Sequence, residues 1–174
     1  IYELERRFNS LSSYKMNKKP IKGEYLEFLL RSSKTIFSTK DISLLWNESN
    51  DSIITDRLKK YAKERKLIRV RRGLYAKDKN YNRLELSTRI NTPSYISFET
   101  VLAKEGVIFQ YYDSIFVASY LNRKMEVDEQ KITFIRMKDY VLSNTIGISH
   151  KDGYAIATKE RAFLDRIYVS KNYY

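Results

Sequence analysis

Four residue types are scarce or missing in this chain of 174 residues, which has no cysteine, one histidine, two prolines and five glycines. Without cysteine, disulfide bonds and thiolate metal ligands are excluded, and a reducing compartment such as the cytoplasm is the expected location. His150 lies in a polar, loop-like segment, and no Ser–His–Asp set can be completed without it. We therefore predict no catalytic residues and expect a binding protein rather than an enzyme.

Several sequence patterns are absent as well. The chain has no run of about 18 apolar residues and no signal-peptide pattern, so we expect no membrane partner. It lacks G-x-G-x-x-G and G-x-x-x-x-G-K-[ST], the loops that usually cradle phosphates, and we predict no cofactor and no metal. The chain begins with Ile1 instead of methionine, so we expect a fragment that lacks its first residues.

Positive charge is abundant and unevenly distributed. The chain carries 33 Lys and Arg against 21 Asp and Glu, a net charge of +12. Residues 1–80 hold 20 of the basic and 10 of the acidic residues, whereas residues 81–174 hold 13 and 11. This asymmetry favours a polyanion-binding first half and a second half with another role. A solvated, lysine-rich surface without a polyanionic partner is the alternative interpretation.

Residues 1–80 predict a small domain built mainly of helices. Apolar residues spaced three and four apart predict the helices, and a short β-branched run predicts a strand. Thr39 is placed to cap the third helix, and Asn50 or Asp51 to cap the fourth. The expected order is a leading helix within 1–19, a helix at 23–30, a strand at 35–38, a helix at 40–46 and a helix at 51–65.

The helix at 51–65 is followed by a basic hairpin. In IRVRRGLYA (68–76) apolar and basic residues alternate, so Arg69 and Arg71 should share one face. Gly73 permits the positive φ of a tight turn. Helices followed by such a hairpin match a winged helix-turn-helix, whose last helix enters the major groove while the hairpin lies along a phosphate backbone.

The candidate contacts to double-stranded DNA follow from this arrangement. Between positions 56 and 72, nine basic residues stand against two acidic ones, the densest positive stretch of the chain. Three interpretations of Asp56 are equally open: it accepts a hydrogen bond from cytosine, it repels DNA, or it is a solvated aspartate without a role in binding. A basic amphipathic helix beside an exposed hairpin, with no nucleic acid, is the alternative. Lys60 and Lys63 are predicted to neutralise the charge of the DNA backbone. The predicted base-reading residues are Ser52, Thr55, Asp56 and Lys59, and the predicted contacts to phosphates or the minor groove are Arg69, Arg71 and Arg72.

Residues 81–174 predict a mixed α/β domain. Ser97 and Thr158 are placed to cap two of its helices. The expected elements are a helix at 82–90, a strand at 94–97, a helix at 98–105, strands at 114–120, 131–136 and 153–157, and a helix from Lys159 onward.

One motif in this half leaves an enzymatic alternative open. Glu129 and Lys131 form an E-x-K, which a metal-dependent DNA-cleaving enzyme could use with a second acid upstream. The motif arises by chance in almost any lysine-rich chain. A basic module that binds an acidic protein is a further alternative, and it predicts no binding to duplex DNA.

Three segments share their order and spacing with a known family. They are RRGLYA (71–76), YISFETVLAKEG (95–106) and AIATKERAFLD (155–165). Across 22–170 the chain resembles the AbiEi-type antitoxins of bacterial type IV toxin–antitoxin systems, which act in abortive infection. Val101 and Phe163 depart from the family pattern by apolar replacements. Relatives usually continue beyond the last motif, so the resemblance implies a truncated second domain.

The resemblance implies an α+β protein in which an N-terminal winged helix-turn-helix (1–80) is followed by a mixed α/β antitoxin domain (81–174). The first domain would bind inverted repeats in the operator of its own operon and repress transcription. The second would counter a nucleotidyltransferase-like toxin, without stable binding in the best-known scheme. The apolar motif residues expected in the core are Ile96, Leu102, Ala162 and Leu164.

Overall fold

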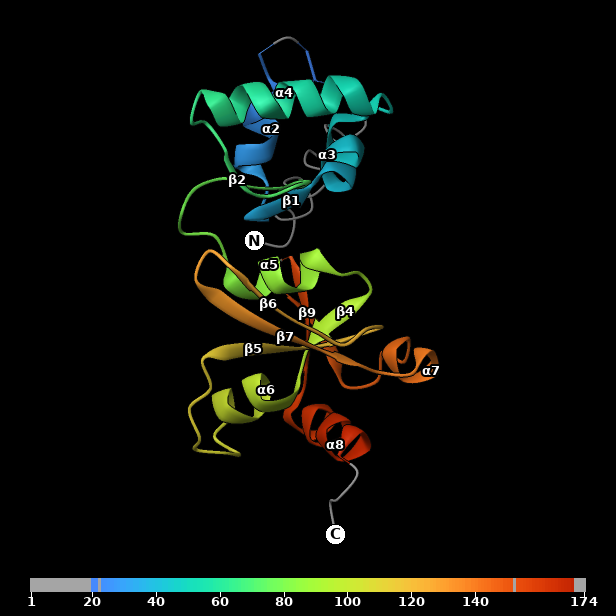
Figure 1. Ribbon diagram of the computed structural model, residues 1–174. Helices are drawn as coiled ribbons and strands as arrows, with labels where there is room; N and C mark the ends of the chain where they lie inside the picture. Colours follow the sequence, from blue (N-terminus) through green and yellow to red (C-terminus); the bar gives the residue numbers. More distant parts are fainter. Residues whose placement is uncertain (1–19, 22, 152, 171–174) are drawn as a thin grey trace, which may run out of the picture.

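The computed structural model describes residues 20–21, 23–151 and 153–170. These residues form a mixed α+β structure with seven helices and two sheets (Figure 1). The helix predicted within 1–19 lies outside the described residues. No helix in the described ranges is long and apolar enough to cross a membrane.

The first sheet has three antiparallel strands in the order β1-β3-β2, and α2, α3 and α4 pack on one of its faces (Figure 1). The order of these elements along the chain agrees with the prediction, and their ends differ from it by only a few residues. The elements are α2 (Tyr25–Arg31), β1 (Ile36–Ser38), α3 (Thr39–Trp46), α4 (Asp51–Lys63), β2 (Ile68–Arg71) and β3 (Leu74–Ala76).

Local sequence explains where α3 and α4 begin. The side chain of Asn50 accepts hydrogen bonds from two backbone N–H groups in the first turn of α4, as predicted for one of its two candidate caps. Helix α3 is capped by Ser38, whereas Thr39 was the predicted cap. The reason is that Asp41 and Ser38 form a reciprocal capping box, which satisfies two backbone donors at once.

The buried face predicted for α4 is confirmed. Ile54 and Leu58 are almost fully buried and pack in one cluster with Leu29 of α2 and Trp46 of α3. Full burial of such a side chain stabilises the fold by about 1.5–3 kcal/mol. This face therefore fixes α4 on the sheet and leaves its opposite face outward.

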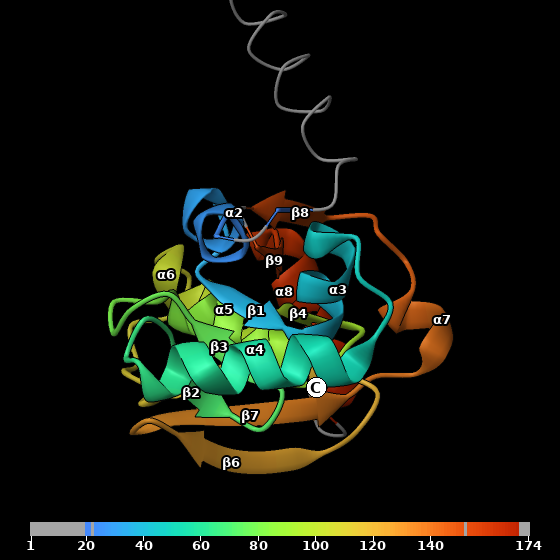
Figure 2. The same ribbon diagram turned by 90° about the horizontal axis from the view of Figure 1, so that it is seen from above.

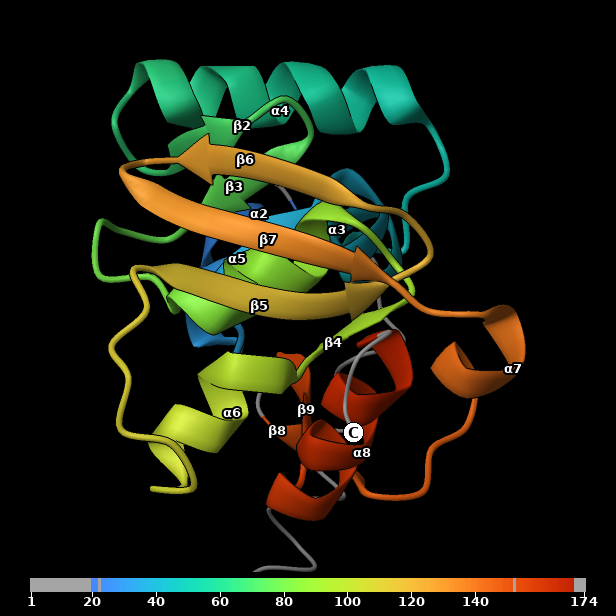
Figure 3. The same ribbon diagram turned by 60° about the horizontal axis from the view of Figure 1, so that its bottom comes forward.

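The second sheet has six strands in the order β6-β7-β5-β4-β9-β8, with β5–β7 and β4–β9 parallel. Helix α5 lies on the face toward the first sheet, and α6 and α8 lie on the other face (Figures 1 and 3). The elements are α5 (Arg83–Ile90), β4 (Ser94–Ile96), α6 (Phe98–Lys104), β5 (Ser114–Ser119), β6 (Arg123–Val127), β7 (Gln130–Arg136), α7 (Asp139–Leu142), β8 (Ile148–Lys151), β9 (Tyr154–Ala157) and α8 (Lys159–Val169).

The predicted strands of this half are confirmed as β4, β5, β7 and β9. The structure adds β6, β8 and the short helix α7, which the sequence analysis does not predict. Strands β6 and β8 are the two edges of the sheet. His150 consequently lies in β8, not in a loop as predicted, and its side chain is exposed.

An apolar cluster joins the two sheets. It fills the face of the first sheet that is turned away from α4, so both faces of that sheet have apolar contacts. Apolar residues of the second half of the chain therefore pack against the hairpin on the face of the first sheet opposite α4. The buried members of the cluster are Ile36, Leu74, Ala76, Tyr81, Leu86 and Val127.

Candidate nucleic-acid interface

The outward face of α4 is polar and mostly basic. Ile53 is the one large apolar side chain on it, 42% exposed. Thr55 is half-buried, while the other predicted contact residues of the helix are exposed. The structure thus places all six on the side of α4 that faces away from the core: Ser52, Thr55, Asp56, Lys59, Lys60 and Lys63.

Two ion pairs lie along this face. Lys59 Nζ is 3.3 Å from Asp56 Oδ1, and Lys60 Nζ is 3.9 Å from Glu64 Oε1. The side chains of the first pair are more than 60% exposed, and pairs of this kind contribute little to stability. A phosphate can therefore replace the carboxylate partner of either lysine with little loss of folding stability. Asp56 has its partner within the same helix, so its charge is compensated locally.

Helix α4 is held in place by an aromatic cluster at its underside. The guanidinium of Arg57 lies 3.7 Å above the ring of Tyr25. Tyr25 also packs edge-to-face on Trp46, whose indole N–H donates to the backbone carbonyl of Tyr25 at 2.9 Å. Arg57 is thus the basic residue of α4 that supports the fold, which leaves the exposed lysines available to a ligand.

The hairpin β2–β3 contains a bulge between Arg69 and Arg71. Arg69 pairs with Tyr75, which packs beneath α4, whereas Arg71 pairs with Leu74, which belongs to the cluster between the sheets. Directly paired residues share a face. The prediction that Arg69 and Arg71 share one face is therefore wrong, because the extra residue at the bulge reverses the alternation.

The hairpin turn has the geometry that its sequence predicts. Gly73 adopts φ +79°, a conformation open to glycine and strained for other residues. Arg72 at this turn and Arg69 on the α4 side are exposed. Arg71 is half-buried, and its Nη1 lies 3.5 Å from Met125 Sδ in β6. The three predicted arginines thus lie at one hairpin, but only Arg69 faces the α4 side of the sheet.

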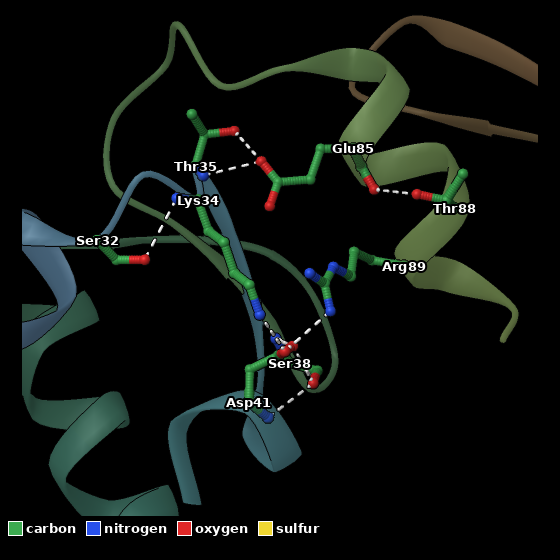
Figure 4. A network of polar contacts seen from close by, with 8 residues as sticks. All are labelled: Ser32, Lys34, Thr35, Ser38, Asp41, Glu85, Thr88 and Arg89. Carbon is green, nitrogen blue, oxygen red and sulfur yellow. Dashed lines mark hydrogen bonds and ion pairs between the residues drawn. The ribbon is translucent and has the colours of Figure 1, made fainter. Parts of the chain in front are cut away.

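A polar network ties α5 to the first sheet (Figure 4). Glu85 Oε2 accepts hydrogen bonds from the backbone N–H of Thr35 at 2.8 Å and from its hydroxyl at 2.6 Å. Glu85 is almost completely buried. A charged residue of the second half therefore fixes the start of β1.

The same network reaches the first turn of α3. Arg89 Nη1 and Lys34 Nζ lie 2.8 and 2.9 Å from Asp41 Oδ1. Burial alone would raise the pKa of Asp41, but hydrogen bonds from Ser38 and Lys34 outweigh burial and lower this pKa. The second half of the chain thereby holds the helix that precedes α4.

The motifs of the second half meet in a buried network that the sequence analysis did not foresee. Asp165 accepts hydrogen bonds from the hydroxyls of Tyr95 and Ser97 at 3.0 and 2.7 Å, and Arg161 Nε lies 2.8 Å from its other oxygen. Burial is the main cause that raises the pKa of Tyr95. Ser97 was predicted to cap α6, but its side chain makes no cap hydrogen bond and binds Asp165 instead.

One residue of the last motif, Leu164, was predicted in the core but is exposed. Ile96, Leu102 and Ala162 are buried as expected, but Leu164 is 61% exposed and its neighbour Phe163 is 44% exposed. In α8 the inward positions are taken by Ala162 and the polar network, so Leu164 points outward.

The residues of the enzymatic alternative do not assemble a metal site. Glu129 lies in the turn between β6 and β7 with φ +64°, and Lys131 Nζ is 2.7 Å from Asp113 Oδ2. Among the described residues, no three His, Cys, Asp or Glu side chains are grouped so that they could hold a metal ion.

Comparison with known proteins leaves the family open. No protein-family model matches the chain, and a search of curated proteins finds no match. The resemblance to AbiEi-type antitoxins stays a prediction.

Proposed function

We propose that residues 20–80 form a winged helix-turn-helix that binds double-stranded DNA, with α4 as the recognition helix and β2–β3 as the wing. The observation that carries this proposal is the combination of α4, whose exposed face is lined with lysines, and a hairpin with exposed Arg69 and Arg72. In a winged helix-turn-helix these two elements meet the major groove and the adjacent backbone.

The charge of this surface supports the proposal. Lys59, Lys60 and Lys63 are exposed, and the carboxylates paired with Lys59 and Lys60, which are Asp56 and Glu64, are exposed too and bind weakly. When lysines and arginines bind DNA phosphates, the cations condensed on the DNA are released, and this release drives association. Arg71, which faces β6, would act at the margin of this surface.

We further propose that the protein is a cytoplasmic antitoxin that represses its own operon by binding inverted repeats and counters a nucleotidyltransferase-like toxin. This part has its support in the three motifs of the sequence. The buried network of Tyr95, Ser97, Arg161 and Asp165 gives these motif residues a common structural role. It supports a folded second half.

The test is fluorescence anisotropy with two duplexes of equal length, one from the region upstream of the protein's own gene and one with the scrambled sequence. We expect tighter binding to the upstream duplex, with a log–log salt slope near −5 if about six phosphates are neutralised. Equal binding to both duplexes that vanishes with salt would reduce the surface to a non-specific basic patch. Binding to an acidic protein but not to DNA would favour the protein-interaction module.

A further inference from the structure

The tip of the hairpin rests on the edge strand β6 of the second sheet. Arg71 contacts Met125, and Val127 of the same strand belongs to the apolar cluster beneath the hairpin. Seen from the α4 side, β6 and β7 emerge past the hairpin and are not covered by α4 (Figure 2). A ligand that follows α4 and the hairpin would therefore meet β6 next.

The strand register decides which residues of β6 and β7 face the hairpin. Side chains alternate along a strand, so Arg123 is on the same face as Met125 and lies about 7 Å from it along β6. Arg123 is paired with Phe134 of β7, and Arg136 follows two positions later on that face. Arg123 and Arg136 thus lie on the face of β6 and β7 from which Met125 contacts Arg71, about 7 and 13 Å further along the strands than Met125.

Both arginines are without an acidic partner among the described residues. Arg123 and Arg136 are exposed, and neither forms an ion pair with any carboxylate in the part of the chain that the structure describes. Glu126 belongs to the opposite face of β6 by alternation. Asp128, beyond the end of the strand, is bound by Arg83 at 2.8 Å. Exposed arginines without an acidic partner in the described part of the chain favour a polyanion as ligand.

We infer that the DNA-binding surface continues from the hairpin onto the second sheet, where Arg123 and Arg136 bind the phosphate backbone beyond the groove that α4 enters. This inference rests on the proposed function and assigns DNA contacts to the second half of the chain. A different role is available to Arg123, because β6 is an edge strand and charged residues on an edge strand also prevent pairing between copies of a sheet.

The test compares the double variant R123A/R136A with K104A/K159A. The control removes the same charge from exposed positions in α6 and α8, on the opposite face of the second sheet. Anisotropy with the upstream duplex should show binding weakened by about tenfold in R123A/R136A and a salt slope flattened by about two units, because each phosphate contact contributes about 0.9. The control should keep the slope, and R123K/R136K should restore it.

Three results would overturn the inference or the proposal beneath it. If R123A/R136A binds like the control while R69A/R72A still loses affinity, the inference fails and the proposed function stands. If R123A/R136A self-associates in size-exclusion chromatography with unchanged DNA affinity, Arg123 protects the edge strand β6 and the inference fails. If the unmodified protein does not bind the upstream duplex at all, the proposed function fails. Circular dichroism of each variant confirms that it is folded.

Discussion

Arg89 of α5 lies 2.8 Å from Asp41, the residue that completes the capping box at the start of α3. The second half of the chain thus holds the helix that leads into α4. Together with the bond between Glu85 and Thr35, this pair joins the two sheets through charged groups as well as through an apolar cluster. The orientation of the proposed recognition helix therefore depends on residues outside the first 80.

The contribution of this pair to stability can be measured. Arg89→Ala should lower the free energy of unfolding by about 1.5–3 kcal/mol, because a hydrogen bond to a largely buried charged group is lost. Arg31→Ala is the matched control, since Arg31 pairs with Glu27 in an exposed i, i+4 pair expected to contribute under about 0.5 kcal/mol. Urea denaturation measures both. Equal, small losses would contradict the structural role of Arg89.

The lowered pKa of Asp41 predicts a dependence of stability on pH. A carboxyl group with a folded pKa below its unfolded value of 3.8 stabilises the fold fully above that value. This stabilisation is lost as the pH falls below 3.8 and through the folded pKa. We expect the unmodified chain to lose more stability than Asp41→Asn between pH 5 and pH 3, measured by urea denaturation at each pH. Parallel curves for the two proteins would contradict the assignment.

The hairpin arginines are predicted to bind phosphates. The double variant R69A/R72A should weaken binding to the upstream and scrambled duplexes alike and flatten the log–log salt slope by about two units. Both side chains are exposed, so the thermal stability should change little. Anisotropy at stepped salt measures the slope. A slope equal to that of the unmodified protein would remove the hairpin from the DNA contact surface.

Gly153 is predicted to be essential for the position of Glu85. A Cβ at Gly153 would lie 2.4 Å from the carboxylate of Glu85, which anchors Thr35. Gly153→Ala should therefore destabilise the fold by about 1–3 kcal/mol more than Gly106→Ala. Gly106 also has a positive φ but would meet no atom within 4 Å, so it controls for backbone strain. Equal losses in thermal denaturation would show that the close approach to Glu85 is unimportant.

The elements that could be predicted from the sequence are those whose apolar residues recur at the helical or strand period and face the core. The helices α3 and α4 and the strands β5 and β7 carry such patterns and were found close to their predicted positions. Strand β6, with the sequence RKMEV, has two apolar residues and lies at an edge, so most of its side chains are solvated and the pattern is weak. The same reason explains β8.

The candidate site was predictable in α4 and only in part in the hairpin. The buried pair Ile54 and Leu58 sets the outward face of α4, so a helical period was enough. A bulge has no comparable signature in IRVRRG, and it decided the direction of Arg71. Contacts such as Arg89–Asp41 and Tyr95–Asp165 join residues 48 and 70 positions apart, and they depend on a tertiary arrangement that local patterns do not contain.

The central claim is that the outward face of α4 contacts DNA, and lysine acetylation footprinting tests it most directly. The protein is acetylated briefly with and without the upstream duplex, and the modification of each lysine is quantified by mass spectrometry. The account predicts that DNA protects Lys59, Lys60 and Lys63, while Lys104 and Lys159 on the far side stay equally reactive. Unchanged reactivity of the three α4 lysines, under conditions where the duplex is bound, would contradict it.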